Sequence, residues 1–197
     1  MLRLFWHCLD PRKGDEEFVA SAFQELADLL RKPPVEAEFQ ATPLTGQVAE
    51  TVAEEFKGPR DEMGSPLPGY FDAVESRIRE RSLWVPLLVY CSVTSEIAKV
   101  CRRAHPSHLW GSAWYPFVSV VYRPNNKYLL WHEALHLFHA HDCYSEDAPN
   151  GPTTCELPDC IMQYAPSEET VGEWPFLCQK NTEAIRRCAE EPPPRTV

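Results

Sequence analysis

One short run with two histidines and a glutamate constrains the structure of this chain more than any other feature. The run is His132-Glu133-Ala134-Leu135-His136. On an α-helix, residues four positions apart lie nearly in line one turn apart, so the two imidazoles can bind one metal ion. Apolar residues from Tyr128 to Leu137 indicate that this helix is buried, and Asn125 or Asn126 can cap its N-terminus.

Two protein ligands are too few for a catalytic zinc ion, which is usually held by three side chains and a water molecule. The candidates for the third ligand are His139, His141 and Asp142, and spacing alone does not decide among them. Bound zinc lowers the pKa of water from about 16 to ~7, so Glu133 can take a proton from that water and deliver it to a leaving amine. The run therefore predicts zinc-dependent hydrolysis of peptide bonds, with Glu133 as general base and acid.

From His132 onward, the chain resembles the metzincin peptidases. In that family a glycine lies three residues after the second histidine, and the third zinc ligand lies three residues after the glycine. The corresponding residues are His139 and Asp142. The resemblance implies that Asp142 is the third ligand, as in the few members, such as the snapalysins, that use aspartate. The family glycine leaves the helix with positive φ, which histidine tolerates better than most residues but with some strain.

The run Cys160-Ile161-Met162-Gln163-Tyr164 is similar to the methionine turn of metzincins. The resemblance implies that Met162 forms an apolar floor under the histidines. It also implies that Tyr164 is a labile zinc ligand or donates a hydrogen bond to the oxyanion that forms during hydrolysis. Ordinary packing of both side chains is the alternative interpretation.

Among the metzincins, the chain most resembles the archaemetzincins, whose cysteines hold a second, structural zinc ion. Cys143 directly follows Asp142, as in that family, and Cys160 lies in the family's Cys-x-Met arrangement. The family's later Cys-x-x-Cys pair is missing, because Cys178 stands alone, and Cys155 is an additional cysteine. Zinc held by these four thiolates would organise a segment with little apolar core of its own. Disulfides and unrelated thiols are the alternatives.

Segments typical of strands alternate with segments typical of helices, which predicts an α/β fold. The resemblance makes this a metzincin-like domain with a mixed, twisted sheet and a metal-binding helix. The expected strands are Leu2–Cys8, Val35–Gln40, Leu83–Tyr90 and one or two strands within Trp110–Tyr122. The expected helices are Asp15–Leu30, Gln47–Phe56, Tyr70–Arg81, Ser95–Arg103, the metal-binding helix and Gln179–Ala189. We expect a single metallopeptidase domain with an α/β subdomain over residues 1–138, a small irregular zinc-binding subdomain over residues 139–190 and a disordered tail over residues 191–197.

The segment before the metal-binding helix is a candidate for contact with substrate. In metzincins, an edge strand at this place pairs with the main chain of an extended peptide. Ala113 to Val121 occupies it here, with Pro116 suited to an edge strand, and a core strand is an equally weighted alternative. We therefore expect a peptide or a protein as the substrate.

The chain is acidic, with a formal net charge of -10 and a pI of about 5.2, which argues against nucleic acid or an anionic membrane as its main partner. No apolar run approaches the ~20 residues of a membrane span, and the N-terminal segment lacks the pattern of a signal peptide. We therefore expect a monomeric cytoplasmic enzyme. Two rival interpretations are an inactive metzincin-like module that holds peptides or partners, and a protein whose zinc sites are purely structural.

Overall fold

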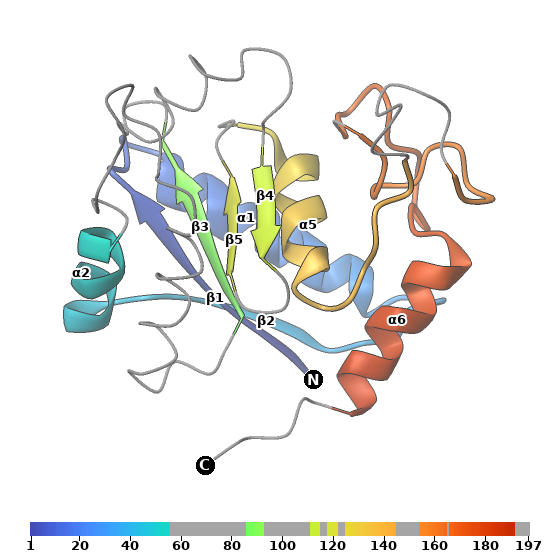
Figure 1. The fold of residues 1–197 in the computed structure, drawn as a ribbon, viewed down its shortest axis with the longest axis horizontal. Helices are drawn as coiled ribbons and strands as arrows, with labels where there is room; N and C mark the ends of the chain where they lie inside the picture. Colours follow the sequence, from blue (N-terminus) through green and yellow to red (C-terminus); the bar gives the residue numbers. More distant parts are fainter. Residues whose placement is uncertain are drawn as a thin grey trace.

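A five-stranded sheet forms the centre of the structure, with its strands in the order β2-β1-β3-β5-β4 (Figure 1). The computed structural model describes residues 1–55, 86–92, 111–114, 118–121, 125–144, 154–164 and 166–191. The strands are β1 (Leu2–Leu9), β2 (Phe39–Pro43), β3 (Leu87–Cys91), β4 (Gly111–Trp114) and β5 (Val118–Val121). Neighbouring strands are parallel except for β4, which is antiparallel to β5. The expected α/β class with a mixed sheet is confirmed.

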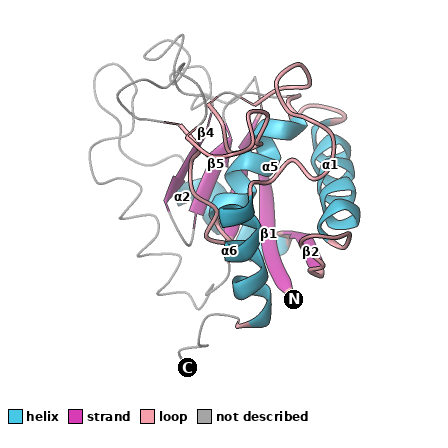
Figure 2. Cartoon of the chain, turned by 90° about the vertical axis from the view of Figure 1, so that its right-hand side faces the viewer, coloured by secondary structure: helices cyan, strands magenta, loops and turns pink. Residues whose placement is uncertain are grey.

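Helices lie on both sides of this sheet. Those in the described ranges are α1 (Asp15–Leu30), α2 (Gly46–Glu55), α5 (Lys127–His136) and α6 (Gln179–Glu190). Helices α1 and α5 pack against each other and cover one face, whereas α2 lies on the opposite side (Figures 1 and 2). The predicted bounds of α1 are confirmed. The predicted α2 is shifted by one residue at both ends, and the predicted α6 ends one residue early.

The core lies between the sheet and the layer of α1 and α5. Side chains of β1 alternate, so that Leu2, Leu4 and Trp6 point into this core while Arg3 is exposed. Every residue of β3 is buried, as expected for a central parallel strand that is covered on both faces. The core is therefore built from period-two positions of the strands and the apolar face of α1.

The predicted strand Val35–Gln40 is wrong in its first part, because β2 begins at Phe39. The residues before Phe39 wrap around the end of α1, where the amide of Ala37 donates to the carbonyl of Leu30 at 2.9 Å. Glu36 has φ 54°, which interrupts an extended chain. Ala37 is buried, so the apolar alternation arose from packing at the end of the helix and not from strand pairing.

The segment Trp110–Tyr122 contains two strands, one of them at a sheet edge, as predicted. The candidate substrate strand Ala113–Val121 is not one strand, however, because β4 ends at Trp114 and β5 begins at Val118. The edge position belongs to β4. Strand β5 pairs with β3 and β4 and is a core strand. Pro116 lies outside the described residues.

Several expected elements also fall outside the described ranges. These are the helices Tyr70–Arg81 and Ser95–Arg103, the first residues of the predicted strand Leu83–Tyr90, and the tail beyond residue 191. Within the part of the chain that is described, no helix has both the length and the apolar character needed to cross a membrane.

One continuous core joins residues on both sides of the predicted subdomain boundary at residue 138. Ile161, Met162, Phe176 and Leu177 belong to the same buried cluster as β1, α1 and α5. Trp131 of α5 is at the junction, because its ring stacks on Phe176 with centroids 5.6 Å apart. The segment after α5 thus packs on the main core.

We expect Trp131→Ala to lower the free energy of unfolding by roughly 3–5 kcal/mol, because it empties a large buried site. The Trp131 side chain is 1% exposed, and its indole N–H also donates to the carbonyl of Ala22 at 2.8 Å. Denaturant-induced unfolding of the purified variants measures the change. The exposed Val48 serves as control, since Val48→Ala should change stability by no more than about 0.5 kcal/mol.

Candidate functional site

Helix α5 carries His132, Glu133 and His136 as predicted. Asn126 is the N-cap, with φ −120° and a side-chain oxygen that accepts from the amide of Leu129 at 3.1 Å. All residues from 129 to 135 are buried, so the helix is held by packing on every side. This packing fixes the rotation of the helix and therefore the direction in which its histidines point.

The two histidines are oriented by main-chain carbonyls. The Nδ1 atom of His132 lies 2.9 Å from the carbonyl oxygen of Ile161, and Nδ1 of His136 lies 2.9 Å from that of Ala140. A carbonyl oxygen can only accept, so each Nδ1 carries the hydrogen and each Nε2 presents a lone pair. The two Nε2 atoms lie 3.1 Å apart. Partners of this kind orient metal-binding histidines in general.

Asp142 completes a triangle of acceptor atoms. Its Oδ1 atom lies 3.3 Å from Nε2 of His132 and 3.2 Å from Nε2 of His136. A tetrahedral zinc ion with N and O ligands at ~2.0–2.1 Å separates them by roughly 3.3–3.4 Å, close to the edges of this triangle. Three lone-pair atoms that face one another repel unless a positive charge lies between them, so the arrangement suits a cation.

Without a metal ion, a proton on His136 can supply part of the positive charge that these acceptor atoms require. Burial lowers the pKa of His136, but the hydrogen bond to Asp142 and the charge of Glu133 outweigh burial and raise the pKa overall. A metal ion must displace that proton to bind. Metal affinity at this triangle should therefore fall as the pH decreases.

His139 and His141 are not part of this group. Both are exposed, and among the described residues the group of possible ligands consists of His132, His136 and Asp142. Of the three candidates that spacing left open, Asp142 is thus the one that the fold brings to the histidines.

His139 instead forms the turn that ends α5. It has φ 72°, the positive value expected at the family's glycine position. The amide of His139 donates to the carbonyl of His136 at 3.1 Å, and that of Ala140 to Leu135 at 3.2 Å. This is the hydrogen-bond pattern of a Schellman motif. This turn reverses the direction of the chain, so that the Ala140 carbonyl lies against the His136 ring and Asp142 lies beside the two histidines.

Glu133 is 5% exposed and lies on the side of α5 that faces β5. The hydroxyl of Ser119, in β5, donates to Oε2 of Glu133 at 3.3 Å. Burial raises the pKa of Glu133, more than the neighbouring histidines lower it. Ser119 was not predicted as a site residue. A lone serine within an apolar strand is nevertheless a usable signal, because buried polar residues require partners.

The predicted methionine turn is attached directly to the histidine site. Ile161 supplies the carbonyl that orients His132, and the carbonyl of Met162 accepts from the amide of Cys143 at 2.7 Å. Met162 is fully buried. The turn therefore fixes one ligand histidine and the residue after Asp142.

Tyr144 lies next to Asp142, and Tyr164 packs on Tyr144. The rings of Tyr144 and Tyr164 pack edge to face with centroids 5.5 Å apart. Burial, together with the nearby charge of Asp142 and a hydrogen bond to it, raises the pKa of Tyr144 above the ordinary tyrosine value. Tyr164 was a predicted site residue. Tyr144 was not, and no pattern in the sequence marks it.

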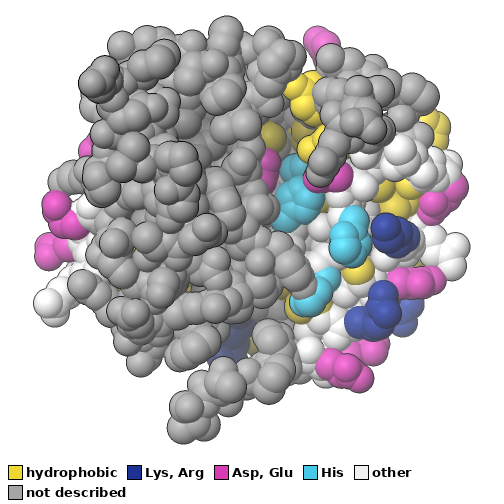
Figure 3. Space-filling view, in the orientation of Figure 1, with side chains coloured by type: hydrophobic (Ala, Val, Ile, Leu, Met, Phe, Trp, Pro, Cys, Tyr) yellow, Lys and Arg dark blue, Asp and Glu magenta, His cyan; other side chains and the backbone are white. Residues whose placement is uncertain are grey.

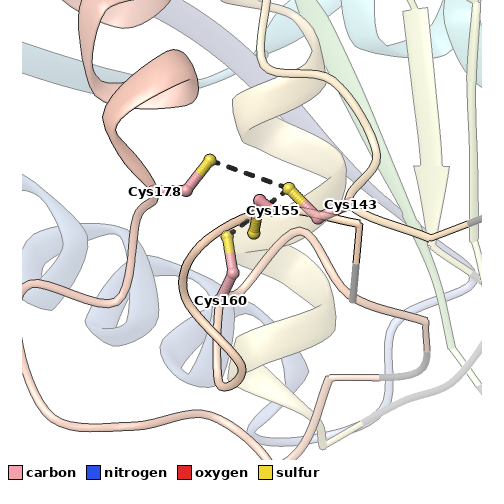
Figure 4. A group of neighbouring side chains, drawn as sticks. All are labelled: Cys143, Cys155, Cys160 and Cys178. Atoms are coloured by element: carbon pink, nitrogen blue, oxygen red, sulfur yellow. Dashed lines mark hydrogen bonds between the residues drawn. The ribbon is translucent and has the colours of Figure 1, made fainter. Parts of the chain in front are cut away.

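The four predicted cysteines, Cys143, Cys155, Cys160 and Cys178, come together in space (Figure 4). Their sulfur atoms lie within 4.8 Å of one another. The Cys143 sulfur is 3.7 Å from that of Cys178 and 3.8 Å from that of Cys160. Zinc–sulfur bonds of ~2.3 Å in a tetrahedron place sulfurs roughly 3.8 Å apart, whereas a disulfide requires about 2.05 Å. None of the four is in a disulfide in this structure, and these sulfur separations fit a metal ion better than a disulfide.

Within the cysteine cluster, Cys160 is the sulfur with a lowered pKa. The hydrogen bond between the Cys160 and Cys143 sulfurs outweighs burial and lowers the pKa of Cys160 to about 6. Burial raises the pKa of Cys178 to about 11. Metal binding requires thiolates, and a metal ion would supply the positive charge that stabilises the remaining ones.

The triangle is reachable from solvent on one side. The side chain of His132 is 5% exposed, that of His136 14% and that of Asp142 38%. In the view of Figure 3, histidine side chains are visible on this face beside acidic and apolar ones. A metal ion held here could keep a coordination position for water or substrate.

Comparisons with known proteins add no relative. No protein-family model matches the chain, and no curated protein matches it significantly.

We expect His139→Gly to raise the free energy of unfolding by roughly 0.5–1 kcal/mol, because glycine removes the strain of positive φ at the helix end. His141→Gly is the matched control and should lower stability by about the same amount, since it only adds freedom to the unfolded chain. Denaturant unfolding measures both. Loss of bound zinc in His139→Gly would contradict the exclusion of His139 from the ligand set.

Proposed function

We propose that this protein is a zinc-dependent peptidase that hydrolyses peptide or protein substrates. The observation that carries the proposal is the triangle of His132, His136 and Asp142, whose acceptor atoms face one another at 3.1–3.3 Å. Glu133 lies beside them on the same helix. A purely structural zinc site would be closed by a fourth side chain, and the described residues contribute three.

Both candidate groups have donor atoms that suit zinc. Two imidazoles and a carboxylate are the ligand types of catalytic zinc sites, and four thiolates are those of structural ones. Bound at the triangle, zinc would supply an acidified water molecule and a positive charge for the carbonyl oxygen of the scissile bond.

The side chains and carbonyls of the protein would then perform the proton transfers, orient the ligands and stabilise the oxyanion. Glu133 accepts the proton of the attacking water and returns it to the leaving amine. Ser119 holds one oxygen of the Glu133 carboxylate, which leaves the other as the proton acceptor. The main-chain carbonyls at the two Nδ1 atoms keep both imidazoles in the tautomer that can bind a cation. Tyr164, whose ring packs on Tyr144, is the residue that we propose donates a hydrogen bond to the developing oxyanion.

Strand β4 is the proposed place for substrate binding. It is the outermost strand of the sheet on the side of α5, and α5 contacts both β4 and β5. An extended peptide that pairs with the edge of β4 left unpaired among the described residues would pass in front of the metal-binding helix (Figure 1). Backbone pairing of this kind binds many sequences with similar affinity, because it does not depend on side chains.

We further propose that the chain is a metzincin of the archaemetzincin type. Support comes from the αL residue after α5, from the turn around Met162 that is bonded to His132, and from the cluster of four cysteines. Unoxidised cysteines agree with the reducing environment of the cytoplasm, where we expect a monomer to act.

We expect Glu133→Gln to reduce hydrolysis of a mixed peptide library by roughly 10²–10⁴-fold, because the amide cannot accept the proton of water. Its zinc content should stay at about two per chain, since Glu133 is not a ligand. The exposed Glu17→Gln is the matched control and should keep full activity. A wild-type protein that binds both zinc ions and leaves every peptide intact would instead identify an inactive binding module.

We expect Cys155→Ser to lower the zinc content by about one ion per chain and to lower the melting temperature, because the segment after Asp142 loses its cross-link. Cys188, a half-buried residue outside the cluster, provides the control substitution Cys188→Ser, which should keep both ions. Elemental analysis and thermal unfolding measure the two effects. If Cys155→Ser retained all its zinc, the four-thiolate centre would be ruled out.

A further inference from the structure

Asn181 connects helix α6 to the segment that carries the third acceptor of the triangle. It lies in the first turn of α6, three residues after Cys178, and its side chain is completely buried. Its Oδ1 accepts from the amide of His141 at 2.8 Å, and its Nδ2 donates to the carbonyl of the same residue at 2.9 Å. One side chain thus satisfies both main-chain groups of the residue directly before Asp142.

The same amide group reaches the cysteine cluster. Nδ2 of Asn181 lies 3.4 Å from the sulfur of Cys143. Only a side-chain amide offers a donor and an acceptor side by side in this way. Replacing it with an acid or an apolar group breaks at least one of the three contacts.

Asp142 needs such support more than the two histidines do. The histidines stand on a buried helix, and each is oriented by a carbonyl. Asp142 lies in an irregular segment, and its side chain is 38% exposed. On its far side the chain is anchored where the Cys143 amide donates to Met162. On its near side, the pair of hydrogen bonds to Asn181 fixes the backbone at His141.

We propose that Asn181 is a positioning residue that holds Asp142 in the metal site through the backbone of His141. The inference rests on the proposed function, because it treats the triangle as a metal site. Outer partners of this kind change metal affinity by roughly 10–100-fold without contacting the metal. Asn181→Leu keeps the volume of the side chain but removes all three contacts, so it should weaken metal binding at the triangle by that factor.

The experiment titrates the full-length, reduced chain with Co²⁺ and compares the wild type with Asn181→Leu. Cobalt held by thiolates absorbs strongly in the near ultraviolet through sulfur-to-metal charge transfer, whereas cobalt at the triangle shows only weaker visible bands. The two sites are therefore read separately in one titration. The expected result is an unchanged thiolate absorption together with at least a tenfold weaker affinity at the triangle.

Thr182 supplies a matched control on the same turn of α6. It is 5% exposed, and its hydroxyl has no hydrogen-bond partner within the described ranges. Thr182→Val removes a buried hydroxyl at the neighbouring position and should leave both cobalt affinities as in the wild type. This control separates an effect of the Asn181 contacts from a general disturbance of α6.

Two results overturn the proposal. One is an affinity at the triangle in Asn181→Leu equal to that of the wild type. The other is a parallel loss of both cobalt sites, which would assign Asn181 to the folding of α6 alone. If Asn181→Leu does not fold, Asn181→Asp replaces it, since the acid keeps the acceptor for the His141 amide and loses only the donor. A wild-type chain that binds no cobalt at the triangle would refute the proposed function itself, which is a separate outcome.

Discussion

Two hydrogen bonds from imidazole rings to main-chain carbonyls determine the geometry on which the rest of the site depends. They join His132 to Ile161 and His136 to Ala140, and therefore attach α5 to two segments that follow it in the chain. Each bond fixes a tautomer, so both remaining nitrogens present lone pairs toward the same point. Helical spacing alone places the rings one turn apart, but these carbonyls aim them at each other.

The candidate catalytic site and the cysteine cluster share their supporting structure. Asp142 of the candidate catalytic site is followed directly by Cys143 of the cysteine cluster. Cys160 of the cluster is followed directly by Ile161, whose carbonyl orients His132. Between α5 and α6, the described residues form no helix or strand, so a metal ion among the sulfurs would stabilise this segment directly. A displacement of the cluster would move one ligand and the orienting carbonyl of another.

Much of the fold followed from local patterns. The helix of Asp15–Leu30 and the buried helix of the histidines came from apolar spacing and capping residues, which act within one or two turns. The start of β2 was mispredicted, because buried apolar residues at the end of α1 imitate strand alternation. Ser119 was missed because it acts on Glu133, which another segment supplies. Tyr144 was missed because no motif marks it, although it interacts with Asp142 only two residues earlier.

The sequence by itself determined the chemistry that the site can offer: two imidazoles and a carboxylate on one helix, and four thiols downstream. The first group, His132, Glu133 and His136, follows from spacing within a single helix. The thiols follow from residue type alone. The resemblance to metzincins implied Asp142 as the third ligand, but only the tertiary structure brought Asp142, and not His139 or His141, to the histidines. The tertiary structure also brought the four sulfurs within reach of one another and gave Asn181 its place between the two groups. These contacts join residues far apart in the chain, or depend on how an irregular segment turns back, and both are set by packing rather than by local propensity.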